Sequence, residues 1–86
     1  MNITVTKTEG AWTFGTVARG SERFTFEVKC CEDATVFGID QGRIVKLWVA
    51  TAIGYTPIAT YERGWDRLPR CEEHWEVTQA IIDRFN

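Results

Sequence analysis

Alternating hydrophobic and polar residues run through the first two-thirds of the chain and predict β-strands. The clearest alternation covers residues 23–31, where Phe24, Phe26 and Val28 are separated by polar or charged residues. Since successive side chains of a strand point to opposite faces, this segment is predicted to bury one face and expose the other. The same kind of pattern predicts further strands over residues 2–8, 11–19, 43–50 and 56–62.

Two of these strands contain tryptophan. The strand over residues 11–19 places Trp12 and Phe14 on one face, and a turn containing glycine joins it to the following strand as a predicted hairpin. The strand over residues 43–50 has apolar side chains on both faces, with Trp48 among them. This pattern predicts a central strand, or an exposed Trp48 with a binding role.

An amphipathic helix is predicted over residues 71–85. Trp75, Ile82 and Phe85 recur at helical spacing, acidic residues open the segment and a basic residue closes it, as the helix dipole prefers. We expect these three residues to pack against the hydrophobic face of the second hairpin strand. The segment 63–70, which precedes the helix, is predicted to be irregular.

This order of elements predicts one α+β domain spanning residues 1–86. Sequential strands joined by short turns pair most simply with their neighbours in an antiparallel meander. We therefore expect an antiparallel sheet of four to five strands, with one C-terminal helix packed on one face.

The charge balance argues against several classes of function. Ten Lys and Arg residues face twelve Asp and Glu residues, which gives a net charge of −2 and a pI near 5.3. Because phosphate contacts dominate the affinity of nucleic-acid binders, the lack of a basic excess disfavours direct nucleic-acid binding. No apolar run approaches the ~20 residues of a membrane span, and the first residues show no secretory signal. With three cysteines of irregular spacing, Cys30, Cys31 and Cys71, we predict a reduced, cytoplasmic protein.

Residues suited to catalysis or metal binding are scarce. The one histidine, His74, and the one serine, Ser21, are predicted on a helix and in a turn, with nothing that links them into a triad. Cys71 and His74 share a helical face, which suits a nucleophile with its base or, together with Cys30 or Cys31, a zinc ion. A pair on the helix surface is the simpler interpretation of Cys71 and His74. No CxxC pair supports a zinc site, and no glycine motif supports phosphate binding. We predict a binding protein rather than an enzyme, with no cofactor and no metal.

Side chains suited to binding are more abundant. Aromatic residues make up 13% of the chain, and four of them are tryptophans. Exposed aromatic residues beside arginines are common interface anchors. Trp65 has a second interpretation, since its indole would also fill the end of the sheet beneath the helix. The candidate binding residues are Trp48, Tyr61, Arg63, Trp65, Arg67, Arg70, Glu72, Glu73 and Glu76.

Two segments resemble an uncharacterised family of small domains encoded by bacteria and their phages. Residues 37–48 read FGI-x-x-GRI-x-KLW, and residues 61–66 read Y-x-RGWD with Pro69 shortly after. The resemblance covers residues 37–69 and extends to the hairpin before and the helix after them. The resemblance implies a phage or mobile-element origin. It implies no activity, because none is attached to the family. The chain departs from the pattern in a longer N-terminal strand and a longer turn over residues 50–57.

Three functional hypotheses follow. The first is a small phage or mobile-element protein that binds and inhibits a host defence protein, such as a CRISPR effector, in the bacterial cytoplasm. Its acidic balance suits docking onto a basic nucleic-acid groove. The second is a nucleotide-signal sponge that uses Arg63, Arg67 and Arg70 with Trp65 or Trp48. The third is a nucleic-acid accessory protein, which the acidic pI disfavours; the sequence leaves oligomerisation open.

Overall fold

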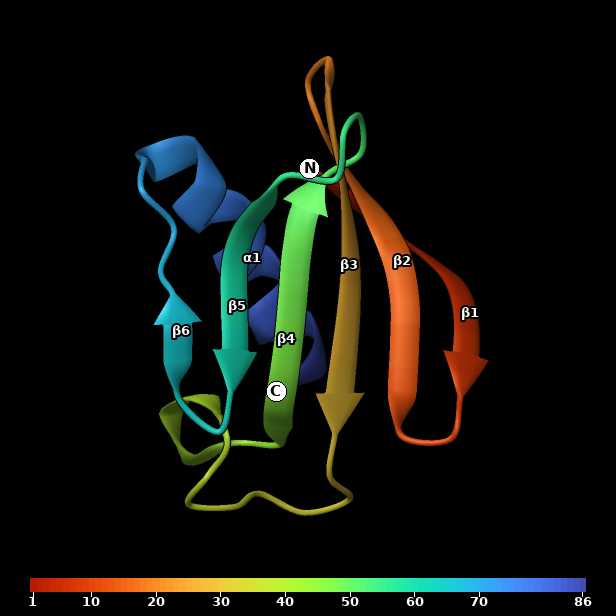
Figure 1. Ribbon diagram of the computed structural model, residues 1–86. Helices are drawn as coiled ribbons and strands as arrows, with labels where there is room; N and C mark the ends of the chain where they lie inside the picture. The colour runs from red at the N-terminus through yellow and green to blue at the C-terminus, as the bar shows by residue number, and fades with distance from the viewer.

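The chain forms one antiparallel sheet with a single helix behind it, in a computed structural model that describes residues 1–86 (Figure 1). The six strands lie in the sheet in the order in which they occur along the chain. The longest connection covers residues 31–43 and contains the short 3-10 turn η1. The elements are β1 (Asn2–Glu9), β2 (Trp12–Arg19), β3 (Glu22–Cys30), η1 (Ile39–Gln41), β4 (Ile44–Thr51), β5 (Pro57–Glu62), β6 (Trp65–Arg67) and α1 (Glu72–Phe85).

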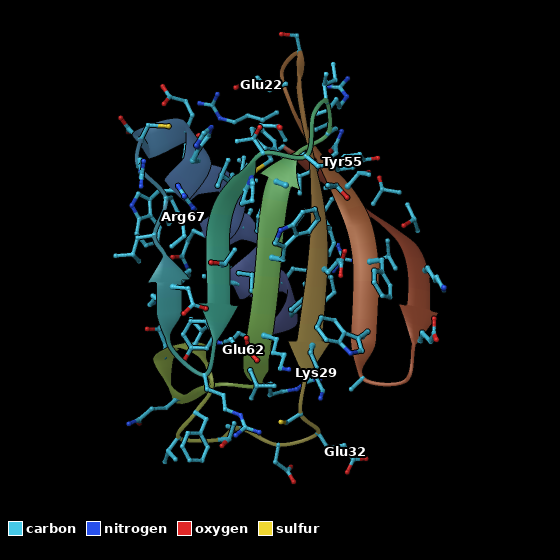
Figure 2. All side chains as sticks on the ribbon, in the orientation of Figure 1. Glu22, Lys29, Glu32, Tyr55, Glu62 and Arg67 are labelled. Atoms are coloured by element: carbon cyan, nitrogen blue, oxygen red, sulfur yellow. The ribbon has the colours of Figure 1, made fainter.

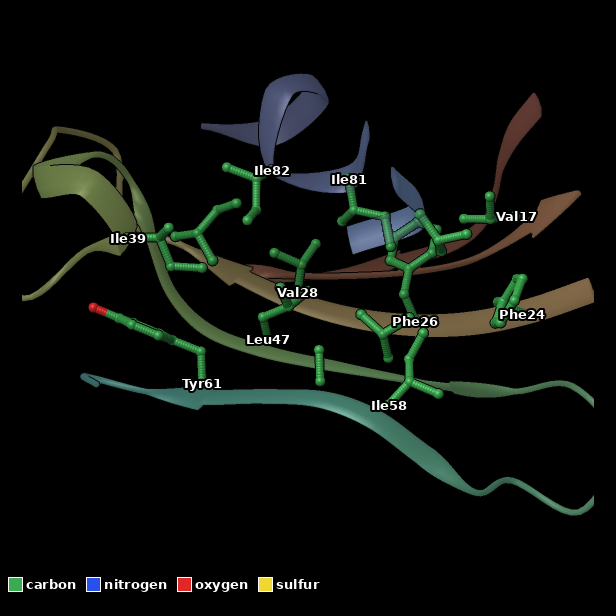
Figure 3. Packing of buried hydrophobic residues seen from close by; sticks show 14 residues of the cluster. Val17, Phe24, Phe26, Val28, Ile39, Leu47, Ile58, Tyr61, Ile81 and Ile82 are labelled. Carbon is green, nitrogen blue, oxygen red and sulfur yellow. The ribbon is translucent and has the colours of Figure 1, made fainter. Parts of the chain in front are cut away.

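The hydrophobic core lies between α1 and one face of the sheet, as Figure 3 shows. The ring of Phe26 on β3 is fully buried and packs against Phe85 of α1, with the ring centroids 5.6 Å apart. No element covers the opposite face of the sheet (Figure 1). The helix has fourteen residues and is too short and too polar to span a membrane. The buried cluster includes Val17, Phe24, Phe26, Val28, Leu47, Val49, Ile58, Ala59, Val77, Ile81 and Ile82.

The predicted antiparallel sheet and C-terminal helix are confirmed, but the predicted strand count of four to five is wrong, because the sheet has six strands. The additional strand, β6, lies within the segment predicted to be irregular. Arg63 adopts a positive φ of 57° and turns the chain directly after β5. Trp65 then pairs with Tyr61 across the turn. A strand of three residues is too short to show a hydrophobic period, so no pattern marked it.

The orientation predicted for Trp75 is also wrong. The buried residues of α1 are Val77, Thr78, Ile81 and Ile82, so the inward face of the helix is centred on them. Trp75 lies at the margin of this face, is 38% exposed and contacts a sheet-edge residue instead of the β3 row. Ile82 is buried and Phe85 packs against Phe26, as predicted, so the error is confined to Trp75 in the first turn of the helix.

The long connection is fastened to the rest of the fold by two side chains from distant parts of the sequence. The Asn86 amide donates a hydrogen bond to the carbonyl of Ile39 at 2.9 Å and accepts one from the N–H of Ile44 at 3.1 Å. The Tyr61 hydroxyl donates to the carbonyl of Phe37 at 2.9 Å. These bonds satisfy partly buried backbone groups that the turn leaves without partners, and they hold Ile39 in the core.

Candidate functional site

The uncovered face of the sheet carries three half-buried aromatic side chains. Trp12 and Phe14 come from β2, and Trp48 comes from the central strand β4. The rings of Trp12 and Phe14 are stacked, with centroids 6.3 Å apart. Their cross-strand partners on β3 are Lys29 and Glu27, which alternate with the buried residues of that strand, so all of them face away from α1. The result is an aromatic surface without a covering element.

The strand register places a carboxylate between two aromatic residues. Phe14, Glu27 and Trp48 are directly opposite one another on three adjacent strands, so they form one row across the sheet. The adjacent row contains Trp12 and Lys29. Figure 2 looks onto this face and labels Lys29 near the C-terminal end of β3. Charged and aromatic side chains are therefore interleaved across the middle of the uncovered face.

A shallow hollow of about 260 Å³ lies within this surface. Trp12 and Trp48 form part of its lining, together with residues of β5 and β6. Among the charged residues, Lys46 and Glu62 are cross-strand partners, and the Lys46 Nζ lies 3.3 Å from a carboxylate oxygen of Glu62. The charged residues that line the hollow are Glu27, Lys46, Glu62 and Asp66.

The charges that line the hollow do not cancel. Three carboxylates face one ammonium group, and that ammonium is already paired with Glu62. The carboxylates of Glu27 and Asp66 take part in no ion pair. At the margin of the aromatic surface, the ammonium of Lys7 lies 5.7 Å from the centroid of the Phe14 ring, which is within cation–π range. The hollow itself is aromatic and net negative.

Of the predicted binding residues, Tyr61 and Trp65 lie on the helix side of the sheet. Tyr61 is 8% exposed and belongs to the core. Trp65 is half-buried and lies between Tyr61 and Trp75, with ring centroids 5.1 and 6.0 Å away. The geometry matches the interpretation in which Trp65 fills the sheet end beneath the helix. Both rings therefore pack against other aromatic residues of the chain.

The three predicted arginines do not converge. Arg67 and Arg70 line a hollow of about 200 Å³ together with His74. Arg63 lies in the turn at the other end of β6, where its guanidinium carbon is 5.9 Å from the centroid of the Phe37 ring. A single phosphate-bearing ligand held by all three guanidinium groups, as the nucleotide-sponge hypothesis requires, does not fit this arrangement.

The acidic residues Glu72, Glu73 and Glu76 are exposed in the first turns of α1. Glu76 accepts a hydrogen bond from the Nε of Arg19 at 2.9 Å, and Glu22 pairs with the same guanidinium. These two bonds, Glu76 first, raise the pKa of Arg19. At the helix start, a hydrogen bond from its own backbone N–H lowers the pKa of Glu73. Part of the acidic helix surface is therefore already neutralised within the chain.

The cysteines do not form the zinc site considered from the sequence. Cys30 lies beside the C-terminal end of α1, with its sulfur 3.8 Å from the carbonyl oxygen of Phe85, whereas Cys71 directly precedes the helix. Fourteen helical residues, about 21 Å, separate these two ends. All three cysteines are free, and burial raises the pKa of Cys30. The structure contains no group of three or more His, Cys, Asp or Glu side chains placed to hold a metal ion.

Sequence reasoning identified Trp48 but missed Trp12, Phe14 and Glu27 as parts of the same surface. The alternation within residues 11–19 did place both aromatic residues on one face. Deciding that this face is shared with Trp48 requires the register of β2 on β3 and of β3 on β4. An aromatic residue at the polar positions of two predicted strands is the signal that could have found the site.

Comparison with known proteins gives one match. A family model described as Domain of unknown function (DUF7678) matches residues 11–86, which include every element except β1. No curated protein matches the chain, and no solved structure matches it. The match agrees with the resemblance to an uncharacterised domain family and assigns no activity to any residue.

Proposed function

We propose that this chain, which belongs to the family described as a domain of unknown function (DUF7678), is a non-catalytic binding protein that docks a partner on the uncovered face of its sheet. The observation that carries the proposal is the set of half-buried rings around one hollow on a face that no element covers. Large aromatic side chains are enriched among the residues that dominate binding energy in protein interfaces. The aromatic surface consists of Trp12, Phe14 and Trp48.

The partner that we propose is a bacterial defence protein, inhibited during infection by a phage or invasion by a mobile element. The charge of the chain supports a partner with a basic surface, because the net charge is −2 and the hollow carries unpaired carboxylates. A basic nucleic-acid-binding groove is such a surface, and occupying it would block the partner without any catalysis. The nucleotide-sponge alternative has less support, because Arg63 lies apart from Arg67 and Arg70.

The proposal is tested by phage plating on bacterial strains that each carry one defence system, including CRISPR systems, with and without the chain. We expect the chain to restore plating on one of these strains. Trp48→Ala should abolish that effect, because loss of a central aromatic anchor costs about 2 kcal/mol or more, roughly a 30-fold loss of affinity. Thermal melting of the purified variant checks that it remains folded.

The matched control is Trp75→Ala, which makes the same chemical change on the helix side of the molecule, at a residue that is 38% exposed. We expect this variant to keep its effect on plating. If Trp75→Ala loses the effect and Trp48→Ala keeps it, the binding surface lies on the helix and the proposal is wrong. Failure of the chain to restore plating on any strain would contradict the inhibitory role.

A further inference from the structure

The hollow on the uncovered face combines two features that together specify the charge of a ligand. The indoles of Trp12 and Trp48 present π-systems, whose faces attract cations. Glu27 and Asp66 add two carboxylates that have no partner within the chain. An anionic ligand, such as a phosphate group, would be repelled by these carboxylates. A ligand that is cationic and has a flat or apolar body satisfies both features.

We infer that the hollow receives the side chain of an arginine from the partner protein. This inference rests on the proposed function, and it names the group on the partner that the surface recognises. The guanidinium is planar, so it stacks on an indole while its N–H groups donate hydrogen bonds toward neighbouring carboxylates. A lysine ammonium is a more strongly hydrated point charge and lacks the planar surface. The volume of about 260 Å³ is the size of a side-chain pocket and not of a cleft for a folded segment.

The position of Glu27 makes it the central recognition residue. It lies directly between Phe14 and Trp48 in the register, so a guanidinium bound to its carboxylate would lie beside aromatic rings. Glu27 is half-buried, which reduces the screening of its charge by water relative to a fully exposed carboxylate. The Lys46 ammonium offsets little of the negative charge of Glu27, because it is paired with the carboxylate of Glu62. Asp66 lines the same hollow and supplies a second hydrogen-bond acceptor. Because Asp66 is exposed, its charge stays hydrated in the folded chain.

The inference is tested with the full chain and a short blocked peptide that contains one arginine. The four tryptophan indole N–H signals are followed by two-dimensional NMR during the titration. We expect saturable shifts of the Trp12 and Trp48 signals, with the Trp65 and Trp75 signals unchanged. The matched control peptide carries citrulline, which keeps the shape of arginine and removes its charge. We expect it to bind about tenfold more weakly or not measurably.

Variants then assign the recognition to named carboxylates. Glu27→Gln should weaken binding of the arginine peptide by about fivefold to tenfold, since it removes the charge and keeps the size of the side chain. Glu32→Gln, which changes an exposed carboxylate in the connection after β3, should leave the affinity unchanged. Because Glu27 is half-buried, Asp66→Asn provides a second variant at an exposed position if Glu27→Gln is unstable. Equal binding by the arginine and citrulline peptides, shifts confined to Trp75, or no shift of Trp12 and Trp48 would each overturn the inference.

The two proposals fail separately. If the arginine peptide does not bind, while the chain restores plating and Trp48→Ala does not, the arginine pocket is wrong and the docking surface stands. If the peptide binds at Trp12 and Trp48 but no defence system is inhibited, the pocket stands and the proposed partner class is wrong.

Discussion

Phe26→Ala is expected to unfold the domain or to lower its melting temperature by more than about 15 °C. Phe26 is completely buried, and removing a buried phenylalanine ring costs about 3–5 kcal/mol. A domain of this length has a total stability of roughly 4–13 kcal/mol, so the loss is a large share of it. Each kcal/mol corresponds to about 4–8 °C in a domain of this size. Circular dichroism with thermal or denaturant melting measures the change.

The cost is expected to fall at the high end, because the site has little capacity to collapse. The Phe26 ring packs against Phe85 on one side and lies over Gly15 on the other, where a Cβ would be 2.6 Å from the ring. A glycine offers no side chain that could move into the space left by the ring. Phe37→Ala is the matched control, since Phe37 is 57% exposed. We expect it to cost less than about 1 kcal/mol, and a comparable loss for both variants would contradict the position of the core.

Gly38→Ala is expected to destabilise the fold by about 3 kcal/mol. The backbone of Gly38 has a φ of −77°, so alanine is allowed there by its torsion angles. A Cβ at this position would nevertheless collide with the carbonyl oxygen of Gly42 and would lie 2.7 Å from its carbonyl carbon. Because these neighbours are backbone atoms, they cannot rotate away as a flexible side chain would. The turn must open to make room, and this displaces the buried Ile39 and the bond between its carbonyl and Asn86.

The control for this substitution is Gly64→Ala. Gly64 lies in the β5–β6 turn, and a Cβ there would meet no atom within 4 Å. We expect the melting temperature of this variant to stay within a few degrees of the original, corresponding to about ±0.5 kcal/mol. Urea unfolding of both variants gives the two free energies directly. A Gly38→Ala protein as stable as Gly64→Ala would show that the turn does not have the close approach described.

Local patterns were sufficient for the long elements of this fold. The alternation of Phe24, Phe26 and Val28 identified the strand β3 and its buried face, and helical spacing identified α1 within one residue of its start. Local patterns were insufficient where contacts between residues distant in the sequence determine the structure. Strand β6 depends on the pairing of Trp65 with Tyr61, and the position of Trp75 depends on its contact with Trp65.

The candidate site illustrates the same division. That Trp48 faces away from its buried neighbours follows from the period of a strand, and this was predicted. Its proximity to Trp12 and Glu27 depends on the register of three strands, which no local pattern specifies. The arrangement of the predicted arginines also depends on pairing: Arg63 and Arg67 are close in sequence, but they lie on either side of the short strand β6.

The central claim is that the uncovered face of the sheet, and not the helix, meets the partner. It is tested most directly by oxidative footprinting of the tryptophans, free and in complex with the defence protein found in the plating screen, with mass spectrometry as the readout. We expect oxidation of Trp12 and Trp48 to fall in the complex, while that of Trp75, which is 38% exposed on the helix side, stays the same. Protection of Trp75 with unchanged labelling of Trp12 and Trp48 would contradict the account.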